Sequence, residues 1–376
     1  MATDEPDATA DADATGEQSA GTGSSDGFAE RIERFRRRSP RLAGPLGGLF
    51  LLLALVLLFT PLFVAAPSGL LVFVEEFSLF LLFALLVVGL NLQFGHTGLV
   101  NFGHVVFFAV GGYTAGLLTA NAPSVGIGLG LPWPVGVAGA VLAAALLGGL
   151  LGVTTLRLRG DFLAIVTLAV AEILHDLLGS FQSVTGGGIG LLSIPTPVAD
   201  LTDSAAEASL ITAILLLGLL LVTYAGVRRL TDSPYGRVLR AIRADERVAE
   251  TLGKDVFGYK LWAFVYGAAI AGAAGALYAF TLGAISPGLF TISVTVTVWV
   301  GMLVGGPGTD WAVVVGVGII VGFRLLTRFL NGEIPAVSAD QFASVRLMMV
   351  GLLLMLIIRY RPQGLFGDAG KLGVDR

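Results

Sequence analysis

The chain has 376 residues, of which 55% are hydrophobic and only 13% are charged, and its net charge is −4. A soluble domain carries roughly 25% charged residues, so this composition excludes an ordinary soluble protein and indicates a polytopic membrane protein. The absence of cysteine excludes a disulfide framework, a thiolate metal site and a cysteine nucleophile. The three histidines, His96, His104 and His175, lack the paired spacing of a metal site, and we expect neither a metal nor a cofactor.

The N-terminal region, residues 1–41, combines an acidic tail with a basic juxtamembrane segment at residues 31–41. The tail is rich in Ala, Asp, Thr and Gly, which predicts disorder. Its acidity fits either a salt-adapted organism or an unremarkable disordered tail. A cleavable signal peptide is not expected, because no basic segment opens the tail and the first apolar run begins only after residue 42.

Residues 42–362 are predicted to form an all-α transmembrane helical bundle, because many apolar runs reach the ~18 residues that span hydrocarbon. We expect about ten spans, with eight or nine as alternatives. Their approximate ranges are 43–63, 70–92, 99–120, 135–156, 162–179, 210–227, 259–282, 292–304, 311–330 and 342–360. The eighth is short for a crossing, which predicts a tilted, broken or re-entrant segment. Residues 363–376 complete the chain as a short cytoplasmic tail.

The orientation follows from the basic residues in the loops. With a cytoplasmic N-terminus and ten alternating spans, every Lys and Arg lies on the cytoplasmic side except Arg324, Arg328 and Arg346. Positively charged loops stay in the cytoplasm. The sequence therefore predicts that both termini and residues 231–260 are cytoplasmic, and that residues 180–209 lie outside.

Residues 231–260 form the only long charged segment inside the apolar part of the chain. Its apolar residues recur at roughly helical spacing, and arginines occupy another face: Val238, Ile242, Ala249 and Leu252 against Arg237, Arg240, Arg243 and Arg247. This pattern predicts an amphipathic helix that begins at Ser233-Pro234 and ends at Gly253. Two interpretations stay open: a basic loop that only sets topology, and a helix whose apolar face docks in a groove of a soluble partner.

Residues 89–114 hold the most unusual intramembrane sequence, because polar residues and glycines interrupt an apolar background. The polar residues are Asn91, Gln93, His96, Thr97, Asn101 and His104, with Gly95, Gly98 and Gly103 between them. Glycine frees the backbone to leave a helix, and a break at membrane depth survives only where it lines protein or water. We expect a break within residues 91–104 that faces the central cavity, with close helix packing as the alternative.

Ionisable residues also occur near the outer end of the fifth span, at Glu172, His175 and Asp176. Such groups usually face a cavity or a partner rather than lipid. Glu172 is therefore a candidate for the substrate pathway, with a structural hydrogen bond as the alternative, and Asp176 could be interfacial.

The predicted outer segment contains Thr185 followed by three consecutive glycines from Gly186, which favours a flexible or nest-forming turn. It is no phosphate loop, since no G-K-[ST] sequence occurs in the chain, and no plausible Ser-His-Asp set is present. We therefore expect no enzyme activity, and energy for active transport has to come from a partner or an ion gradient. Together, the patterns nominate a substrate pathway at Asn91, Gly95, Gly98, Asn101, His104, Glu172, Thr185, Gly186 and Gly187.

Several segments resemble one known family. In order they are GLNLQFGHTGLVNFGHVVFFAVGGYT, LRLRGDFLAIVTLAVAEI, VTGGGIGL, SPYGRVLRAIRADERVAETLGKDVFGYKLWAFVYGAAIAGAAGALYA, VGGPGTDW and RPQGLFG. This combination, from Gly89 to Gly367, is similar to the branched-chain amino-acid permeases of ABC importers, and most similar to the longer, M-type subunit. The resemblance implies a multi-pass cell-membrane permease for Leu, Ile or Val. It also implies a second homologous permease, two cytoplasmic ATPases and an extracytoplasmic binding protein as partners, and no nucleic acid.

The resemblance further implies that residues 231–258 are the ATPase-coupling loop. Its candidate coupling residues are Gly236, Arg237, Arg240, Ile242, Arg243, Glu250 and Gly253. Two departures are that Ile189-Gly190 stands where the family often has Asn-Gly, and Thr251 where it usually has Ala. Urea or short amides therefore stay open as alternative substrates. An ion-coupled secondary amino-acid transporter, with Glu172 and Asp176 as coupling carboxylates, is the alternative of a different class.

The topology can be tested on this cysteine-free chain with a Ser193→Cys variant. A membrane-impermeant maleimide should label it from outside intact cells, because residues 180–209 carry no Lys or Arg. The matched control is Glu250→Cys, which should react only in inside-out vesicles. Labelling of the Ser193→Cys variant from the inside alone would refute the topology.

Overall fold

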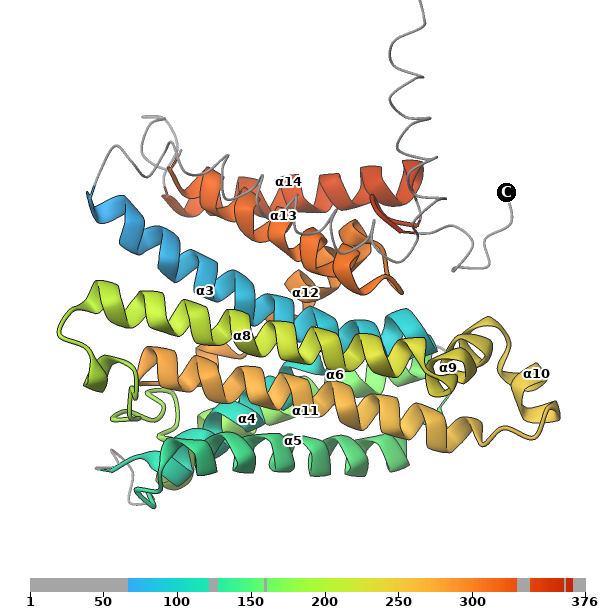
Figure 1. Ribbon diagram of the computed structural model, residues 1–376, viewed down its shortest axis with the longest axis horizontal. Helices are drawn as coiled ribbons and strands as arrows, with labels where there is room; N and C mark the ends of the chain where they lie inside the picture. The colour runs from blue at the N-terminus through green and yellow to red at the C-terminus, as the bar shows by residue number, and fades with distance from the viewer. Residues whose placement is uncertain (1–66, 122–127, 159–160, 330–338, 362, 368–376) are drawn as a thin grey trace, which may run out of the picture. The chain divides into compact units, whose positions relative to one another are not determined.

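The computed structural model describes residues 67–121, 128–158, 161–329, 339–361 and 363–367. The predicted N-terminal region, the first predicted span and the last nine residues, 368–376, lie outside these ranges. The described helices that are longer than one turn, shown in Figure 1, are α3 (Pro67–Leu90), α4 (His104–Thr119), α5 (Trp133–Thr155), α6 (Asp161–Ser180), α8 (Ala205–Asp232), α9 (Pro234–Ala244), α10 (Glu246–Thr251), α11 (Val256–Leu282), α12 (Ile292–Gly305), α13 (Asp310–Phe329) and α14 (Ala339–Tyr360).

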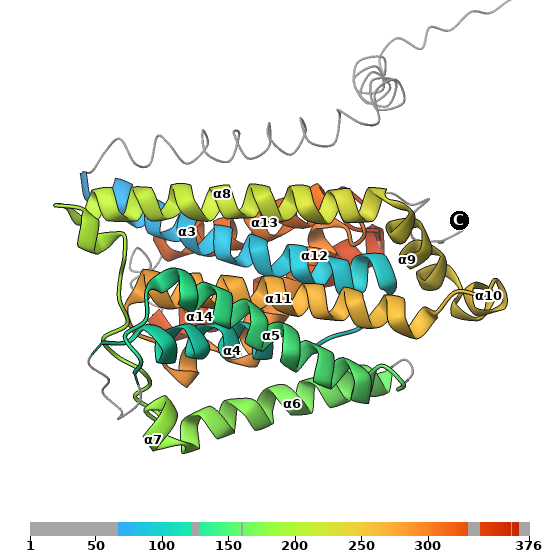
Figure 2. The same ribbon diagram turned by 60° about the horizontal axis from the view of Figure 1, so that its bottom comes forward.

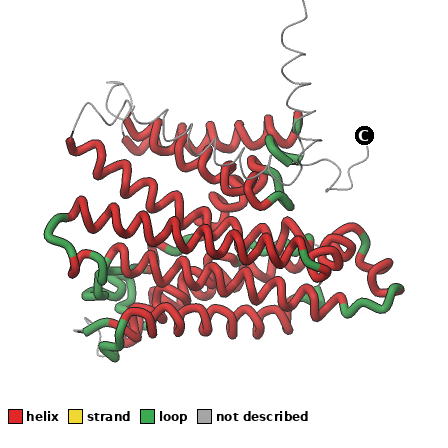
Figure 3. The backbone as a smooth tube through the Cα atoms, viewed as in Figure 1, coloured by secondary structure: helices red, strands yellow, loops and turns green. Residues whose placement is uncertain are grey.

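Short turns complete the described fold: η1 (Asn91–Gly95), α7 (Gln182–Thr185), η2 (Ala199–Leu201) and η3 (Pro287–Leu289). Among the described residues there is no β-strand, only an isolated antiparallel bridge between Leu191 and Ile285. The tube in Figure 3 is accordingly helical between its connecting loops. The all-α prediction is confirmed.

The predicted spans from the second onward each coincide with one long helix, α3 to α6, α8 and α11 to α14. Within the described residues, 6 helices are long and apolar enough to cross a membrane, and His104–Thr119 and Met348–Ile357 are shorter apolar helices. The count of about ten spans therefore stays a prediction. Figures 1 and 2 show α9 and α10 at one end of the bundle, and Figure 2 shows α7 at the opposite end. We call these the α9 end and the α7 end.

Small residues let the helices around α11 approach closely. The buried face of α11 is built mainly of alanine and glycine, including Gly267, Ala268, Ala271, Gly272 and Gly275. A Cβ atom at Gly275 would lie 2.0 Å from the Phe108 carbonyl oxygen of α4, and one at Gly111 would lie 2.1 Å from the Gly272 oxygen. Apolar attraction does not drive helices together in lipid, so close van der Waals packing of this kind stabilises the bundle.

Capping divides the charged loop into two helices, where the sequence pattern predicted one. Ser233 and Pro234 begin α9 as predicted, but α9 ends at Ala244. Asp245 caps α10 by accepting a hydrogen bond from the Val248 amide at 3.1 Å. Gly253 follows α10 with φ +72°, the left-handed conformation that its predicted role required.

We predict that Gly275→Val destabilises the protein by about 1–3 kcal/mol, because the added side chain has to push α4 away from α11. The thermal unfolding midpoint of detergent-purified protein measures this. Gly218→Ala on α8 is the matched control, since a Cβ atom there meets nothing within 4 Å. That variant should be neutral or more stable, because alanine favours helix. Equal melting of Gly275→Val and wild type would contradict the proposed packing.

Candidate functional site

The predicted break in the second and third spans is present. The π-helical turn η1 follows α3, helical structure ends at Thr97, and α4 begins only at His104. Gly98 has φ +77°, a conformation that residues with a side chain rarely adopt. The polar side chains of this segment are all buried, namely those of Asn91, Gln93, His96, Thr97, Asn101 and His104.

Asp310, at the start of α13, joins the break to two other elements. Its Oδ1 atom accepts a hydrogen bond from the Asn91 side-chain amide at 2.7 Å and lies 2.9 Å from Nε2 of His96. Its Oδ2 atom lies 3.4 Å from the Thr231 hydroxyl at the end of α8. The Asp310 side chain is only 11% exposed, and a buried carboxylate needs such donors to offset its lost hydration.

The turn before α13 contacts the break through its backbone. The Gly308 amide donates to Oδ1 of Asn91 at 2.8 Å. A Cβ atom at Gly95 would lie 1.9 Å from that same Oδ1 atom and 2.6 Å from the Gly308 nitrogen. Only glycine at position 95 therefore permits this approach of the two backbones.

A second buried network of hydrogen bonds connects the break to α11 and α12. The Gln93 side-chain amide donates to the Phe264 carbonyl of α11, and its oxygen accepts from the Asn101 amide, both at 2.9 Å. Oδ1 of Asn101 accepts from the Gly103 amide at 2.8 Å, and its carbonyl accepts from the Trp299 indole at 2.9 Å. These partners satisfy groups that would otherwise be unpaired in a buried site.

Arg243, in the last turn of α9, connects the charged loop to the break. Its guanidinium donates a hydrogen bond to the Gly95 carbonyl and lies 5.7 Å from the centre of the Phe94 ring. Burial lowers the pKa of this guanidinium, which still stays protonated at neutral pH. A carbonyl and an aromatic face are suitable partners for a partly desolvated cation.

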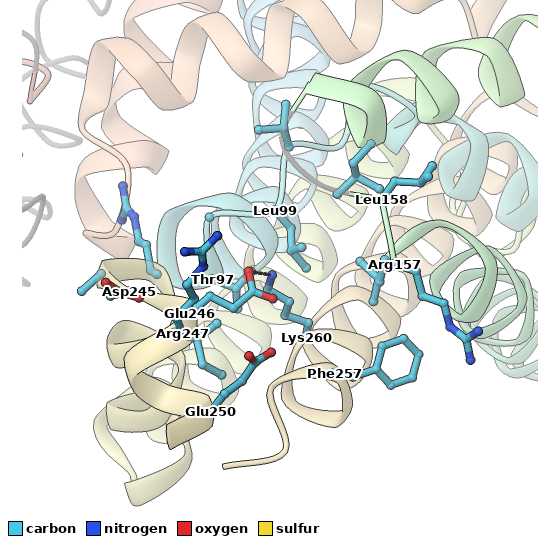
Figure 4. Close-up of a pocket in the computed structure, with 17 residues that line it drawn as sticks. Thr97, Leu99, Arg157, Leu158, Asp245, Glu246, Arg247, Glu250, Phe257 and Lys260 are labelled. Atoms are coloured by element: carbon cyan, nitrogen blue, oxygen red, sulfur yellow. Dashed lines mark hydrogen bonds and ion pairs between the residues drawn. The ribbon is translucent and has the colours of Figure 1, made fainter. Parts of the chain in front are cut away.

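A cavity of about 820 Å³ opens between the break and the charged loop (Figure 4). One wall is formed by Thr97 to Val100, and another by residues 242–247 and Glu250. The turn after α5 and the start of α11 complete it, and Lys260 of α11 pairs with Glu246 of α10 at 2.6 Å, as drawn in Figure 4. Any displacement of α9 and α10 therefore alters the space beside the break.

Among the predicted pathway residues of the break, Gly98 lines the large cavity and Asn101 a small one of about 10 Å³, whereas Asn91 and His104 line neither. Asn91 is 0% and His104 is 1% exposed, and His104 Nε2 bonds to the Leu86 carbonyl at 3.1 Å. This corrects the expectation of a cavity-facing Asn91 and His104: polar side chains inside a bundle pair with neighbouring backbone instead. Gly98 is exposed and lines the cavity of Figure 4.

The remaining pathway candidates lie elsewhere. Glu172 is exposed on α6, away from the buried networks. Thr185, Gly186 and Gly187 are buried at the α7 end, where the Thr185 hydroxyl donates to the Leu178 carbonyl at 2.6 Å. These three residues shape the loop, and the exposed ones that follow are Gly188 and Ile189.

The coupling candidates divide into buried and exposed groups. Gly236 and Ile242 are buried, Arg240 donates to the Thr231 carbonyl at 2.8 Å, and Arg243 bonds to Gly95. Ile242 packs with Ala249 and Val256 inside the chain. The expectation that Ile242 docks into a partner is therefore corrected, because its own chain covers it. The exposed candidates are Arg237, Glu250 and Gly253.

Sequence reasoning missed Asp310 and Trp299 as members of the site. Asp310 stands in the segment VGGPGTDW, which drew attention only through the family resemblance. A lone acidic residue directly after a glycine-rich turn, at the edge of an apolar run, is the signal that could have found it. Trp299 lies in an apolar helix, where nothing in the local sequence indicates a hydrogen bond.

The comparisons with known proteins agree with this architecture. The family described as "Branched-chain amino acid transport system / permease component" matches residues 72–358. The permease protein LivM of Escherichia coli (strain K12) is 34% identical over 313 residues, covering 78% of this chain and 69% of the relative.

More distant relatives include a probable LivM permease of Methanocaldococcus jannaschii, 27% identical over 323 residues, which cover 76% of this chain and 91% of the relative. The permease LivH of Escherichia coli (strain K12) is 25% identical over 292 residues, with the same coverage of 76% and 91%. No solved structure matches.

Several helices that are long and apolar enough to cross a membrane indicate a multi-pass membrane protein. The chain belongs to the branched-chain amino acid transport permease family. The resemblance read from the sequence motifs is confirmed, including the greater similarity to the M-type relative.

We predict that Asn101→Ala lowers stability even without a transported ligand. The change leaves the Gly103 amide and the Gln93 oxygen without their present partner, and each such buried group costs about 1–3 kcal/mol. Thermal unfolding in detergent measures the loss. Thr154→Ala is the control, because its exposed hydroxyl only bonds to its own helix. An unchanged midpoint for Asn101→Ala would show that this network contributes little.

Proposed function

We propose that this chain is the permease subunit of an ABC importer for branched-chain amino acids. The names of the relatives support the substrate class, since both LivM and LivH are permease proteins of a high-affinity branched-chain amino acid transport system. Their occurrence as two proteins supports a second, homologous permease as partner. An extracytoplasmic binding protein delivers the amino acid, and two cytoplasmic ATPases supply the energy that this chain cannot.

The observation that carries the proposal is the α9–α10 pair at one end of the bundle (Figure 2). Its inner side is fixed to the bundle by Leu239, Ile242 and Ala249, all buried. Its outer side exposes two large apolar side chains, Val248 at 53% and Leu252 at 70%. An apolar pair among charged residues outside the bundle suits a soluble partner, whereas an ion-coupled carrier has no need of it.

The proposed ATPase contact is therefore α10 with its C-terminal turn, comprising Arg247, Val248, Glu250, Thr251 and Leu252. Packing of the apolar pair supplies most of the affinity, and the exposed charges fix orientation. When ATP closes the ATPases, α9 and α10 move together, and the bundle shifts from inward-open to outward-open. The shift is driven by the different affinity of the ATPases for the two states.

The second permease is proposed to cover the outer face of α6. Apolar side chains on this face are exposed, among them Phe162, Ile165 and Ile173, and Glu172 lies exposed on the same helix. A carboxylate facing hydrocarbon is costly, so this face has to meet either a polar cavity or a partner. A substrate pathway between the two permeases meets both requirements, with the exposed Gly188 and Ile189 at its outer end.

The proposed function is tested by uptake of labelled leucine into vesicles that contain both permeases and the ATPases. Uptake should require the binding protein and ATP on the side of the membrane that carries the ATPases. Excess isoleucine or valine should compete with leucine for uptake. Competition by urea or acetamide alone would favour the amide alternative. Uptake without ATPases, driven by a proton or sodium gradient, would establish a secondary transporter and overturn the proposal.

We predict that Leu252→Asp, alone or with Val248→Asp, lowers ATPase affinity at least about tenfold, because a carboxylate replaces an apolar anchor. Co-purification of the ATPases and ATP-driven uptake measure the loss. Leu201→Asp is the matched control, since Leu201 is 86% exposed in the turn η2 before α8, outside the α9–α10 pair. Wild-type association of the Leu252→Asp/Val248→Asp double variant would mean that α9 and α10 are only a topogenic loop.

A further inference from the structure

Within the part of the chain that the structure describes, Arg243 makes the hydrogen bond that connects the α9–α10 pair to the helix break. Its acceptor is the carbonyl of Gly95, the last residue of the π-helical turn η1. Carbonyl groups at the end of a helix lack partners within that helix. The guanidinium therefore satisfies a group that the break itself leaves open.

The same segment of the break is also held by a second element, the start of α13. Asn91 accepts from the Gly308 amide and donates to Asp310, and His96 also contacts Asp310. Position 308 has no room for a side chain, because a Cβ atom there would lie 2.9 Å from Nη1 of Arg243 and from the Gly95 oxygen. The start of α13 and the end of α9 thus meet each other and the break at Gly95.

We propose that Arg243 is the positioning residue that transmits movement of α9 to the helix break, with Asp310 as the fixed anchor of the same segment. This inference rests on the proposed function, in which ATPases move α9 and α10. Withdrawal of the guanidinium leaves the Gly95 carbonyl facing the cavity of Figure 4, so the segment from Gly95 to Val100 changes conformation. The break is then the two-state element through which ATP state reaches the membrane part.

The neighbouring arginines provide the contrast. Arg240 bonds within the loop region, to the Thr231 carbonyl, and Arg237 is exposed. Both lie on the same short helix as Arg243 and carry the same charge. Arg237→Met is therefore a matched control, which removes a guanidinium from α9 without touching the break.

The first experiment uses the permease alone, with a Val100→Cys reporter on the cysteine-free background. Val100 is half-buried and lines the cavity beside the break. Arg243→Met should raise the rate of maleimide labelling of this cysteine by about tenfold, a typical size for coupling between sites. Arg243→Lys should be intermediate, and Arg237→Met should match wild type. An unchanged rate in Arg243→Met would overturn the inference.

The second experiment uses the full complex in vesicles, where ATP hydrolysis and leucine uptake are measured together. Arg243→Met should retain the ATPases, because the α10 surface is intact, but transport about tenfold less leucine per ATP hydrolysed. The difference in Val100→Cys labelling between nucleotide-free and ATP-trapped complexes should also disappear. Asp310→Asn is the second variant, for the case that Arg243→Met does not fold, and it should reduce the same ratio.

The two experiments distinguish failure of the proposed importer function from failure of the role proposed for Arg243. If the wild-type complex shows no ATP-driven uptake, the proposed function is wrong, and the labelling rate in the permease alone still decides whether Arg243 holds the break. If wild-type uptake is normal and Arg243→Met keeps the wild-type ratio of transport to hydrolysis, the role of Arg243 is overturned while the importer stands.

Discussion

Unpaired backbone groups at the helix break are the constraint on which the rest of the structure depends. Most residues of this segment are buried, so protein groups have to satisfy these backbone groups. The hydroxyl of Thr167 on α6 accepts from the Phe102 amide, and that of Thr295 on α12 accepts from the Val105 amide. Trp299 of α12 and Arg243 of α9 donate to carbonyls of the same segment. One irregular stretch thereby determines which helices must lie beside it.

The same constraint explains the glycines in and around the break. Hydrogen-bonding partners on separate helices reach the break only where the backbones approach closely. A Cβ atom at Gly103 would lie 2.4 Å from the Thr167 carbonyl oxygen, and one at Gly267 would lie 2.5 Å from the Gln93 amide nitrogen. Glycines within the break thus let the backbone leave the helix, and glycines on neighbouring helices leave room for the side chains of the break. Within residues 89–114, an interruption of the helix and close helix packing thus occur together.

Local signals predicted much of the fold, and distant contacts decided most of the site. Ser233-Pro234 and Gly253 were located from residue type alone, because their roles depend on the backbone within one turn. The role of Asp310 depends on Asn91, which is 219 residues away in sequence. Likewise, the spacing around Ile242 reveals an apolar face but does not say whether a partner or the chain's own α11 covers it. Sequence periodicity therefore predicted a helix at Ile242 but not which surface covers its apolar face.

The attachment of α10 to the bundle is slighter than that of α9, and this explains how α10 can move while the bundle stays folded. Besides Arg243 and Arg240, α9 is held by Leu239, which packs with Leu92 and Ala263, and by the Tyr235 hydroxyl, which donates to the Tyr259 carbonyl at 3.0 Å. α10 is held by Ala249, which packs with Ile242 and Val256, and by the Glu246–Lys260 pair. Glu246 is 43% exposed in that pair, and exposed ion pairs contribute only about 0–1 kcal/mol. The core around α11, by contrast, is close-packed and resists deformation. A displacement imposed at α10 is therefore concentrated at the break, where a hydrogen bond rather than an interlocked core has to give way.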